Sequence, residues 1–133
     1  MAATVGDAIM KILLVDESWT IRNMQKNTLR TLGYEDIDEA ADGLEALSAL
    51  SREKPDLMLV DWHMPNMDGI TLIRKVRETD KALPIIMVTT EAEKSRVMEA
   101  VKAGVNNYVV KPFTAETFAA KIRQTLGKVA VSA

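Results

Sequence analysis

The sequence contains no cysteine among its 133 residues, which excludes disulfide bonds and thiolate metal sites. This absence fits a reducing compartment. No apolar run approaches the roughly 20 residues that are needed to span a bilayer. The first residues, MAATVGDAIM, lack the basic start and the long apolar core of a signal peptide. We therefore expect a cytoplasmic protein that does not engage a membrane.

The chain also lacks a large excess of either charge. Its net charge of -2 argues against broad binding to nucleic acid, which requires a basic face. The fractions of apolar residues (47%) and charged residues (27%) are ordinary for a globular protein. Because 133 residues is the length of one domain with a substantial core, we predict a single domain.

Five short apolar runs have the length of β-strands. They are too short for helices and lack strict alternation, which is typical of strands buried on both faces of a parallel sheet. These runs cover residues 12–15, 37–40, 57–60, 85–88 and 108–110.

Between the runs, apolar residues recur at helical spacing. The five stripes are Ile21, Met24, Thr28 and Leu32; Ala46, Leu47 and Leu50; Ile70, Ile73 and Val76; Val97, Ala100 and Val101; and Phe118, Ile122 and Leu126. Five β–α units in succession predict an α/β three-layer sandwich with a parallel sheet and right-handed crossovers. We expect this domain to cover residues 10–128, between a flexible N-terminal tail (1–9) and a C-terminal tail (129–133).

Local signals mark the ends of the predicted helices. Gly33 and Gly104 lie where the first and fourth helices should end. Thr90 and Glu93 have the spacing of a capping box at the start of the fourth helix. Side-chain N-caps are predicted for the second, third and fifth helices, at Asp42, Asp68 and Thr114.

Polar residues follow the predicted strands at their carboxyl ends, where open parallel sheets bind ligands. One edge of the sheet should therefore collect three carboxylates, two hydroxyls and one ammonium. The residues concerned are Asp16, Glu17, Asp61, Thr89, Thr90 and Lys111.

This set of groups has a specific chemistry. Neighbouring carboxylates repel one another unless a cation is present, and oxygen ligands suit Mg²⁺ or Mn²⁺. A carboxylate beside such an ion and facing a lysine can attack phosphorus and form an aspartyl phosphate. The ion, the ammonium and a hydroxyl then stabilise the charge on the phosphoryl oxygens. A single acid after a strand is usually a helix cap or a loop residue, but polar groups at four strand ends are hard to attribute to chance.

The stretches ILLVDES, LVDWHMPNMDGI, LPIIMVTTEAEK and AGVNNYVVKPFT resemble the receiver domains of two-component response regulators. Among these, the resemblance is greatest to the stand-alone chemotaxis receivers of the CheY type, and it covers about residues 10 to 127. It implies a flavodoxin-like (βα)5 fold. The strand order 2-1-3-4-5 is a property of that family and is carried over with the resemblance.

The resemblance also implies roles for the acidic residues. Asp61 matches the phosphoacceptor. Asp16 and Glu17 match the acidic pair that holds Mg²⁺, together with Asp61 and the main-chain carbonyl of His63. Glu17 departs from the commoner aspartate, so the geometry of the metal site is in question.

Further roles follow for the switch residues. Thr89 matches the hydroxyl that closes on the phosphoryl group, and Tyr108 matches the aromatic side chain that turns inward with it. Lys111 matches the lysine that contacts a phosphoryl oxygen, and the Lys111–Pro112 bond is expected to be cis. In this family, the fourth helix, fifth strand and fifth helix form the surface that binds the target.

His63 and Glu91 border the same site, two residues after Asp61 and Thr89 respectively. One interpretation is that the imidazole of His63 is simply exposed and has little effect. The sharper hypothesis is that both residues set the access of hydrolytic water and so the lifetime of the phosphorylated state.

The leading functional hypothesis is a monomeric, non-enzymatic signalling switch that a histidine kinase phosphorylates. Its expected target is the flagellar motor switch, and a phosphatase is a further expected partner. A phosphorelay intermediate is the alternative within the family. The alternative from another class is a Mg²⁺-dependent phosphohydrolase that also uses an aspartyl phosphate, although such an enzyme usually needs an acid where this chain has His63. A flavodoxin-like FMN binder would need backbone donors and Ser, Thr or Gly in the acidic loop that follows the first strand.

Overall fold

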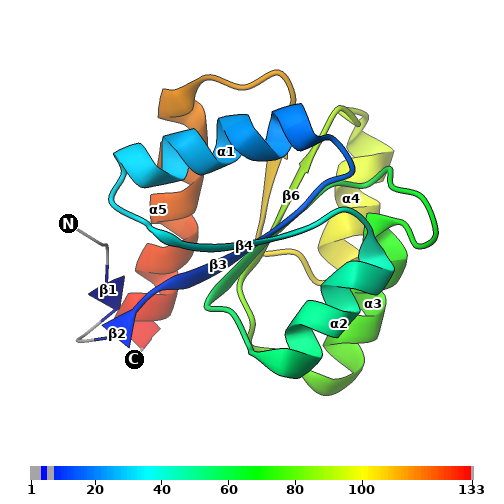
Figure 1. Ribbon diagram of the computed structural model, residues 1–133. Helices are drawn as coiled ribbons and strands as arrows, with labels where there is room; N and C mark the ends of the chain where they lie inside the picture. Colours follow the sequence, from blue (N-terminus) through cyan, green and yellow to red (C-terminus); the bar gives the residue numbers. More distant parts are fainter. Residues whose placement is uncertain (1–3, 6–7, 133) are drawn as a thin grey trace.

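A five-stranded parallel sheet forms the centre of the molecule (Figure 1). The computed structural model describes residues 4–5 and 8–132 of the chain. The strands of this sheet are β3 (Lys11–Val15), β4 (Asp36–Ala40), β5 (Leu57–Val60), β6 (Ile85–Thr89) and β7 (Asn107–Val110). They lie in the order β4-β3-β5-β6-β7, and all neighbours are parallel. The predicted parallel sheet with order 2-1-3-4-5 is therefore confirmed.

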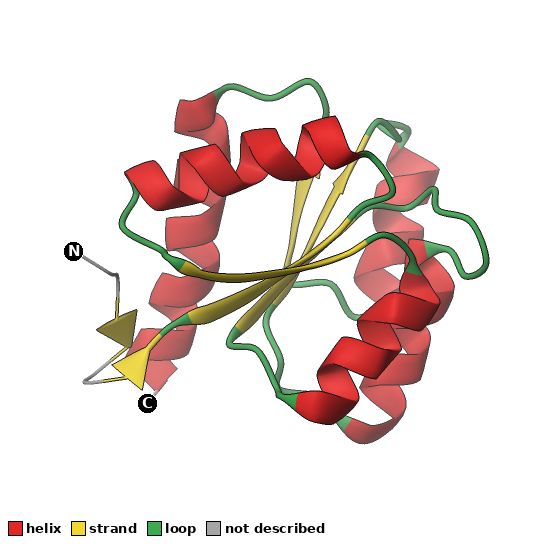
Figure 2. Ribbon diagram, viewed as in Figure 1, coloured by secondary structure: helices red, strands yellow, loops and turns green. Residues whose placement is uncertain are grey.

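Helices cover both faces of the sheet, as Figure 2 shows. They are α1 (Trp19–Thr31), α2 (Gly43–Arg52), α3 (Gly69–Thr79), α4 (Lys94–Ala103) and α5 (Ala115–Ser132). Helices α1 and α5 lie on one face, while α2, α3 and α4 lie on the other. The three-layer arrangement is thus also confirmed. None of the helices in the described part of the chain is both long enough and apolar enough to cross a membrane.

Two hydrophobic clusters fill the space between the layers. Leu13 and Met58 face the cluster shared with α2, α3 and α4. Ile12 and Leu57, one residue earlier on the same strands, face the cluster shared with α1 and α5. Both faces of the central strands are therefore buried, which explains why their sequences are continuously apolar.

Most of the predicted helix ends are confirmed. Gly33 and Gly104 adopt left-handed backbone angles, with φ of 99° and 112°. The predicted N-caps each accept a hydrogen bond from a backbone N–H of the first helical turn, and they are Asp42, Asp68 and Thr114. The capping box of Thr90 and Glu93 is wrong, because α4 begins only at Lys94 and Glu93 makes no capping bond through its side chain.

Two predicted helix faces are wrong in part. In α1 the buried residues are Gln25 and Leu29, whereas Met24 is 51% exposed. The polar residue Gln25 thus lies on the inward face of α1, and the buried face of this helix does not coincide with the predicted apolar stripe. On α4, Ala100 is buried but Val101 is exposed.

The ends of the chain carry secondary structure beyond the predicted domain. Helix α5 continues to Ser132, past residue 128, and the domain boundary at that residue stays a prediction. Residues 128–132 contain no proline or glycine that would end the helix. At the other end, β1 (Thr4–Val5) pairs antiparallel with β2 (Ala8–Ile9) in a separate two-stranded sheet. The flexibility expected for residues 1–9 stays a prediction, and residues 1–3, 6–7 and 133 lie outside the described part.

Candidate functional site

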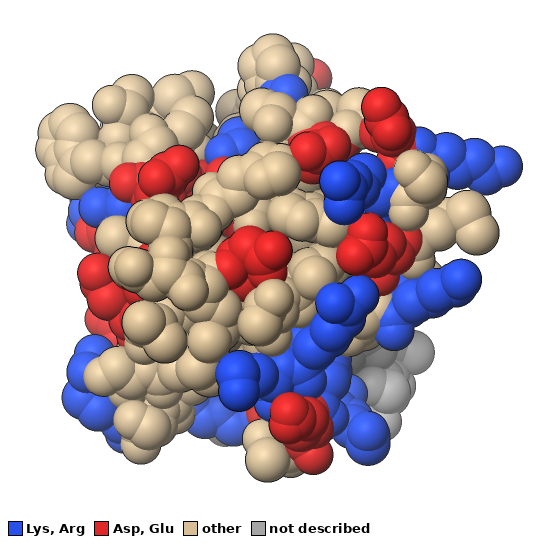
Figure 3. All heavy atoms as spheres, turned by 90° about the vertical axis from the view of Figure 1, so that its right-hand side faces the viewer, with Lys and Arg blue, Asp and Glu red and all other residues tan. Residues whose placement is uncertain are grey.

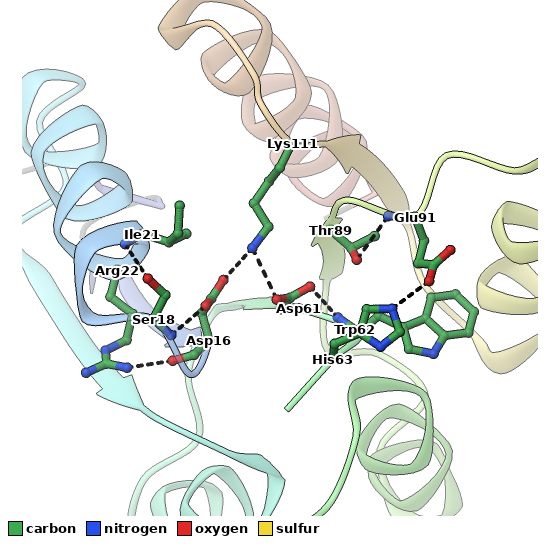
Figure 4. Close-up of polar contacts among 10 residues, drawn as sticks. All are labelled: Asp16, Ser18, Ile21, Arg22, Asp61, Trp62, His63, Thr89, Glu91 and Lys111. Atoms are coloured by element: carbon green, nitrogen blue, oxygen red, sulfur yellow. Dashed lines mark hydrogen bonds and ion pairs between the residues drawn. The ribbon is translucent and has the colours of Figure 1, made fainter. Parts of the chain in front are cut away.

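Three of the predicted site residues meet at the carboxyl edge of the sheet (Figure 4). Asp16 follows β3, Asp61 follows β5 and Lys111 follows β7. The Nζ atom of Lys111 lies 2.8 Å from Oδ2 of Asp16 and 3.1 Å from Oδ2 of Asp61. The parallel sheet brings these residues together because it aligns the ends of its strands on one edge.

Backbone N–H groups hold the two carboxylates in place. Oδ1 of Asp16 accepts a hydrogen bond of 2.9 Å from the N–H of Ser18. Oδ1 of Asp61 accepts a bond of 2.7 Å from the N–H of Trp62. Both acids are buried, and Asp16 is only 2% exposed. Each carboxylate therefore has one oxygen fixed by the main chain and the other turned toward Lys111 (Figure 4).

The charges at this site are not balanced. Burial acts to lower the pKa of Lys111, but the hydrogen bond that its ammonium donates to Asp16 and the charges of Asp61 and Asp16 outweigh this effect, and the pKa is raised. The side chain therefore stays an ammonium near neutral pH. One ammonium faces two carboxylates, so the site favours a further positive charge.

The donor atoms of Asp16 and Asp61 fit a hard cation such as Mg²⁺, which binds through one or two carboxylates and keeps several waters. Glu17, by contrast, is exposed. No group of three potential metal-ligating side chains occurs in the described part of the chain. Contacts with Lys111 thus bring together two of the three predicted carboxylates, Asp16 and Asp61, and Glu17 does not complete a group of three with them in the described part of the chain.

Glu91 connects the remaining predicted residues. The Tyr108 hydroxyl donates a hydrogen bond of 2.7 Å to the Glu91 carbonyl oxygen. The Glu91 N–H lies 3.4 Å from Oγ1 of Thr89, a residue with no exposed surface. The Glu91 carboxylate lies 2.6 Å from Nε2 of the exposed His63. Glu91 is therefore held by contacts from three segments of the chain.

Tyr108 is half-buried against the core cluster that contains Trp62. Burial raises its pKa to about 12, the charges of Glu91 and Asp61 add to this effect, and Arg96 opposes it. The hydroxyl is consequently protonated at neutral pH and acts as a donor to Glu91. The Lys111–Pro112 peptide bond is cis, as expected.

Arg22 and Gly69 were not identified from the sequence, although both position site residues. Nη1 of Arg22 donates to the carbonyl oxygen of Asp16 at 2.6 Å, and its Nε is ion-paired with Glu39 at 3.0 Å. A Cβ atom at Gly69 would overlap the carbonyl oxygen of Asp61. The Asp-Gly pair in MPNMDG is a signal for this close approach, whereas nothing in the sequence singles out Arg22.

Arg96 in the first turn of α4 is a third such residue. Its guanidinium lies over the ring of Trp62, 5.2 Å from the ring centre, and it is ion-paired with Glu99 at 3.3 Å. Trp62 is only 3% exposed and immediately follows Asp61. A cation–π contact therefore joins α4 to the residue whose N–H holds the Asp61 carboxylate.

Comparison with known proteins agrees with this geometry. Residues 12–123 match the model of the response regulator receiver domain. The chain is 50% identical over 121 residues to chemotaxis protein CheY1 of Helicobacter pylori, covering 89% of this chain and 98% of that protein. It is 47% identical over 115 residues to chemotaxis protein CheY-3 of Vibrio cholerae, covering 85% of this chain and 88% of that protein.

Solved structures show the same likeness. The crystallised chemotaxis protein CheY4 of Vibrio cholerae matches with a TM-score of 0.82 at 37% identity. The match covers 89% of this chain and 99% of that one. A CheY-like receiver domain protein of Methanospirillum hungatei matches with a TM-score of 0.87 at 28% identity, covering 95% of this chain and 100% of that one.

Proposed function

The chain belongs to the family of response regulator receiver domains, and on that premise we propose that it is a phosphorylatable switch in chemotaxis. The observation that carries this proposal is the convergence of Lys111 on two buried carboxylates, Asp16 and Asp61. Proteins of this type are signalling switches and not classical enzymes. The chain would catalyse only its own phosphorylation and dephosphorylation.

Asp61 is the proposed phosphoacceptor. Its carboxylate attacks the phosphorus of a phosphohistidine on a histidine kinase, an O–P bond forms, and the N–P bond breaks with its electron pair going to the imidazole. No general base is needed, because the nucleophile is already an anion. Lys111 then keeps its ammonium against the phosphoryl oxygens, and the Thr89 hydroxyl donates to one of them.

Asp16 and Asp61 would hold Mg²⁺, or Mn²⁺ in its place. The carbonyl of His63 and the carboxylate of Glu17 are proposed as further ligands, directly or through water. When bound, the ion supplies positive charge to the phosphoryl oxygens. The chain's own contribution is to fix the two carboxylates by hydrogen bonds from Ser18 and Trp62.

The proposed switch runs through Thr89, Glu91 and Tyr108. A phosphoryl group that binds Thr89 in only one of two conformations would favour that conformation. The change would reach Tyr108 through the loop of Glu91, whose carbonyl oxygen accepts the hydrogen bond from the Tyr108 hydroxyl. The target would bind the surface of α4, β7 and α5, where the apolar Met98, Val101 and Val110 are exposed. We propose the flagellar motor switch as this target, since the relatives reported above are chemotaxis proteins.

The contact between His63 and Glu91 supports the hypothesis that they tune the phosphorylated lifetime. Their contact of 2.6 Å spans the loops that follow β5 and β6, at the rim of the site. Replacing His63 with Asn breaks this contact and should change the rate of dephosphorylation. Equal rates for the variant and the wild type would remove the hypothesis.

The test of the main proposal is incubation of the full chain with Mg²⁺ and a small acyl phosphate, followed by intact mass and phosphate release. We expect one phosphoryl group per chain, lost slowly, and none on Asp61→Asn. Rapid multiple turnover would point to a phosphohydrolase instead. An unlabelled wild-type chain would overturn both readings.

A further inference from the structure

Lys and Arg side chains gather on the side of the molecule formed by α3 and α4 (Figure 3). A groove of about 440 Å³ lies between these helices. Four cationic and two acidic side chains line it, so its charge is positive although the whole chain is at -2. This basic groove is lined by Arg74, Arg77, Lys81, Lys102, Glu78 and Glu99.

Two of the four cations of the groove, Lys81 and Lys102, are available to a partner, whereas Arg74 is ion-paired with Glu99 at 3.4 Å. Lys81 and Lys102 are exposed. Within residues 4–5 and 8–132, no ion pair involves Lys81, Lys102 or Arg77. The charge of Asp80 acts on Arg77, but Asp80 is itself ion-paired with Lys54 at 3.0 Å. The groove therefore presents the ammonium groups of Lys81 and Lys102 without an ion-pair partner among the described residues.

Arg77 also fixes the two walls of the groove. From α3, its Nε and Nη2 donate to the carbonyl oxygen of Gly104, just after α4, at 3.0 and 2.8 Å. Nη2 donates further to Oδ1 of Asn106 at 3.1 Å. Because α3 and α4 are tied in this way without a ligand, a bound segment would not have to order the groove first.

We propose that the basic groove docks an acidic segment of a partner protein. Separate carboxylates can pair with Lys81 and Lys102 and avoid Glu78 and Glu99. The two acids of the groove and the net charge of -2 disfavour the dense, continuous negative charge of a nucleic-acid backbone.

The groove is separate from the proposed switch. It is built from α3 and the α4 side that carries Glu99 and Lys102, whereas Met98 and Val101 are exposed elsewhere on α4. None of its lining residues belongs to the cluster of Asp16, Asp61 and Lys111. Docking there goes beyond the proposed function and does not require phosphorylation.

The test uses the unphosphorylated full chain and calorimetric titration with a blocked helical peptide that carries glutamates on one face. The same peptide with glutamines is the matched ligand control. We expect the wild type to bind the glutamate peptide only, and more weakly as salt is added. Lys81→Glu combined with Lys102→Glu should weaken binding by about tenfold, whereas Arg123→Glu, an exposed change on α5, should leave it within about twofold.

Three results would overturn the proposal. They are no binding of the glutamate peptide, equal binding by the double variant, and equal binding of the glutamine peptide. Tighter binding of a short DNA duplex at the same salt would replace it with a polyphosphate surface. Because the double variant should still accept phosphate from an acyl phosphate, failure here is distinguishable from failure of the proposed function.

Discussion

Replacing Lys111 with methionine tests the charge balance at the centre of the site. The ammonium bridges Asp16 and Asp61 at 2.8 and 3.1 Å, and all three side chains are largely buried. Breaking a buried ion pair by removing one partner typically costs about 3 to 5 kcal/mol, because the remaining charge has no counterpart. We therefore expect the free energy of unfolding of Lys111→Met to fall by about 3 kcal/mol in the presence of a chelator.

Mg²⁺ should return part of this loss. An ion present at ten times its dissociation constant stabilises the folded state by about 1.4 kcal/mol. In the wild type the ammonium already occupies the space between the carboxylates, so the gain from Mg²⁺ should be smaller there than in Lys111→Met. Urea unfolding at a fixed pH, with chelator or with Mg²⁺, measures both differences.

A matched control is Lys81→Met, which removes an exposed ammonium and should change stability by less than about 0.5 kcal/mol. The reasoning is refuted if Lys111→Met is as stable as this control in chelator. It is also refuted if Mg²⁺ stabilises the variant no more than the wild type, because the two carboxylates would then not attract a cation.

Three further predictions concern other parts of the molecule. Gly69→Ala should lower the free energy of unfolding by roughly 2 kcal/mol and slow phosphorylation by acyl phosphate, because the added Cβ would displace the Asp61 carbonyl; an unchanged rate would argue against this close approach. Arg77→Ala should cost about 2 kcal/mol in urea unfolding, since the Gly104 carbonyl loses two charged donors, and a variant as stable as wild type would contradict this. Hydrogen bonds to two neighbouring carboxylates raise the pKa of Lys11 to about 12, so its contribution to stability is complete below about pH 10.5 and is lost as the pH rises through 12. The unfolding free energy of wild type should thus fall more steeply than that of Lys11→Met across this interval, and parallel curves would refute the assignment.

The sheet and the centre of the site were predictable from the sequence because both depend on strand ends. Five apolar runs define five strands, and parallel pairing places whatever follows them on one edge. Asp16, Asp61 and Lys111 each come directly after a strand, so their convergence follows from the topology alone. The cis bond at Lys111–Pro112 was expected from the family resemblance.

Contacts that depend on side-chain direction were not predictable. The inward face of α1 includes Gln25, which no apolar pattern would select. Helix α4 begins only at Lys94, and Glu91 in the loop before it contacts Tyr108 and His63, which are distant from it in the sequence. The neighbouring acids Asp16 and Glu17 also differ, since Asp16 is buried and Glu17 is exposed, and their adjacent positions in the sequence do not indicate this.

The placement of Trp62 makes it an intrinsic fluorescent probe of the site. Its indole is 3% exposed, lies under the guanidinium of Arg96 and follows the proposed acceptor directly, whereas the other tryptophan, Trp19, is 65% exposed. A collisional quencher such as iodide should therefore quench the fluorescence of Trp19 and leave the emission of Trp62. A Trp19→Phe chain would retain a single fluorophore, through which events at Asp61 and movements of α4 could be followed in real time without a label.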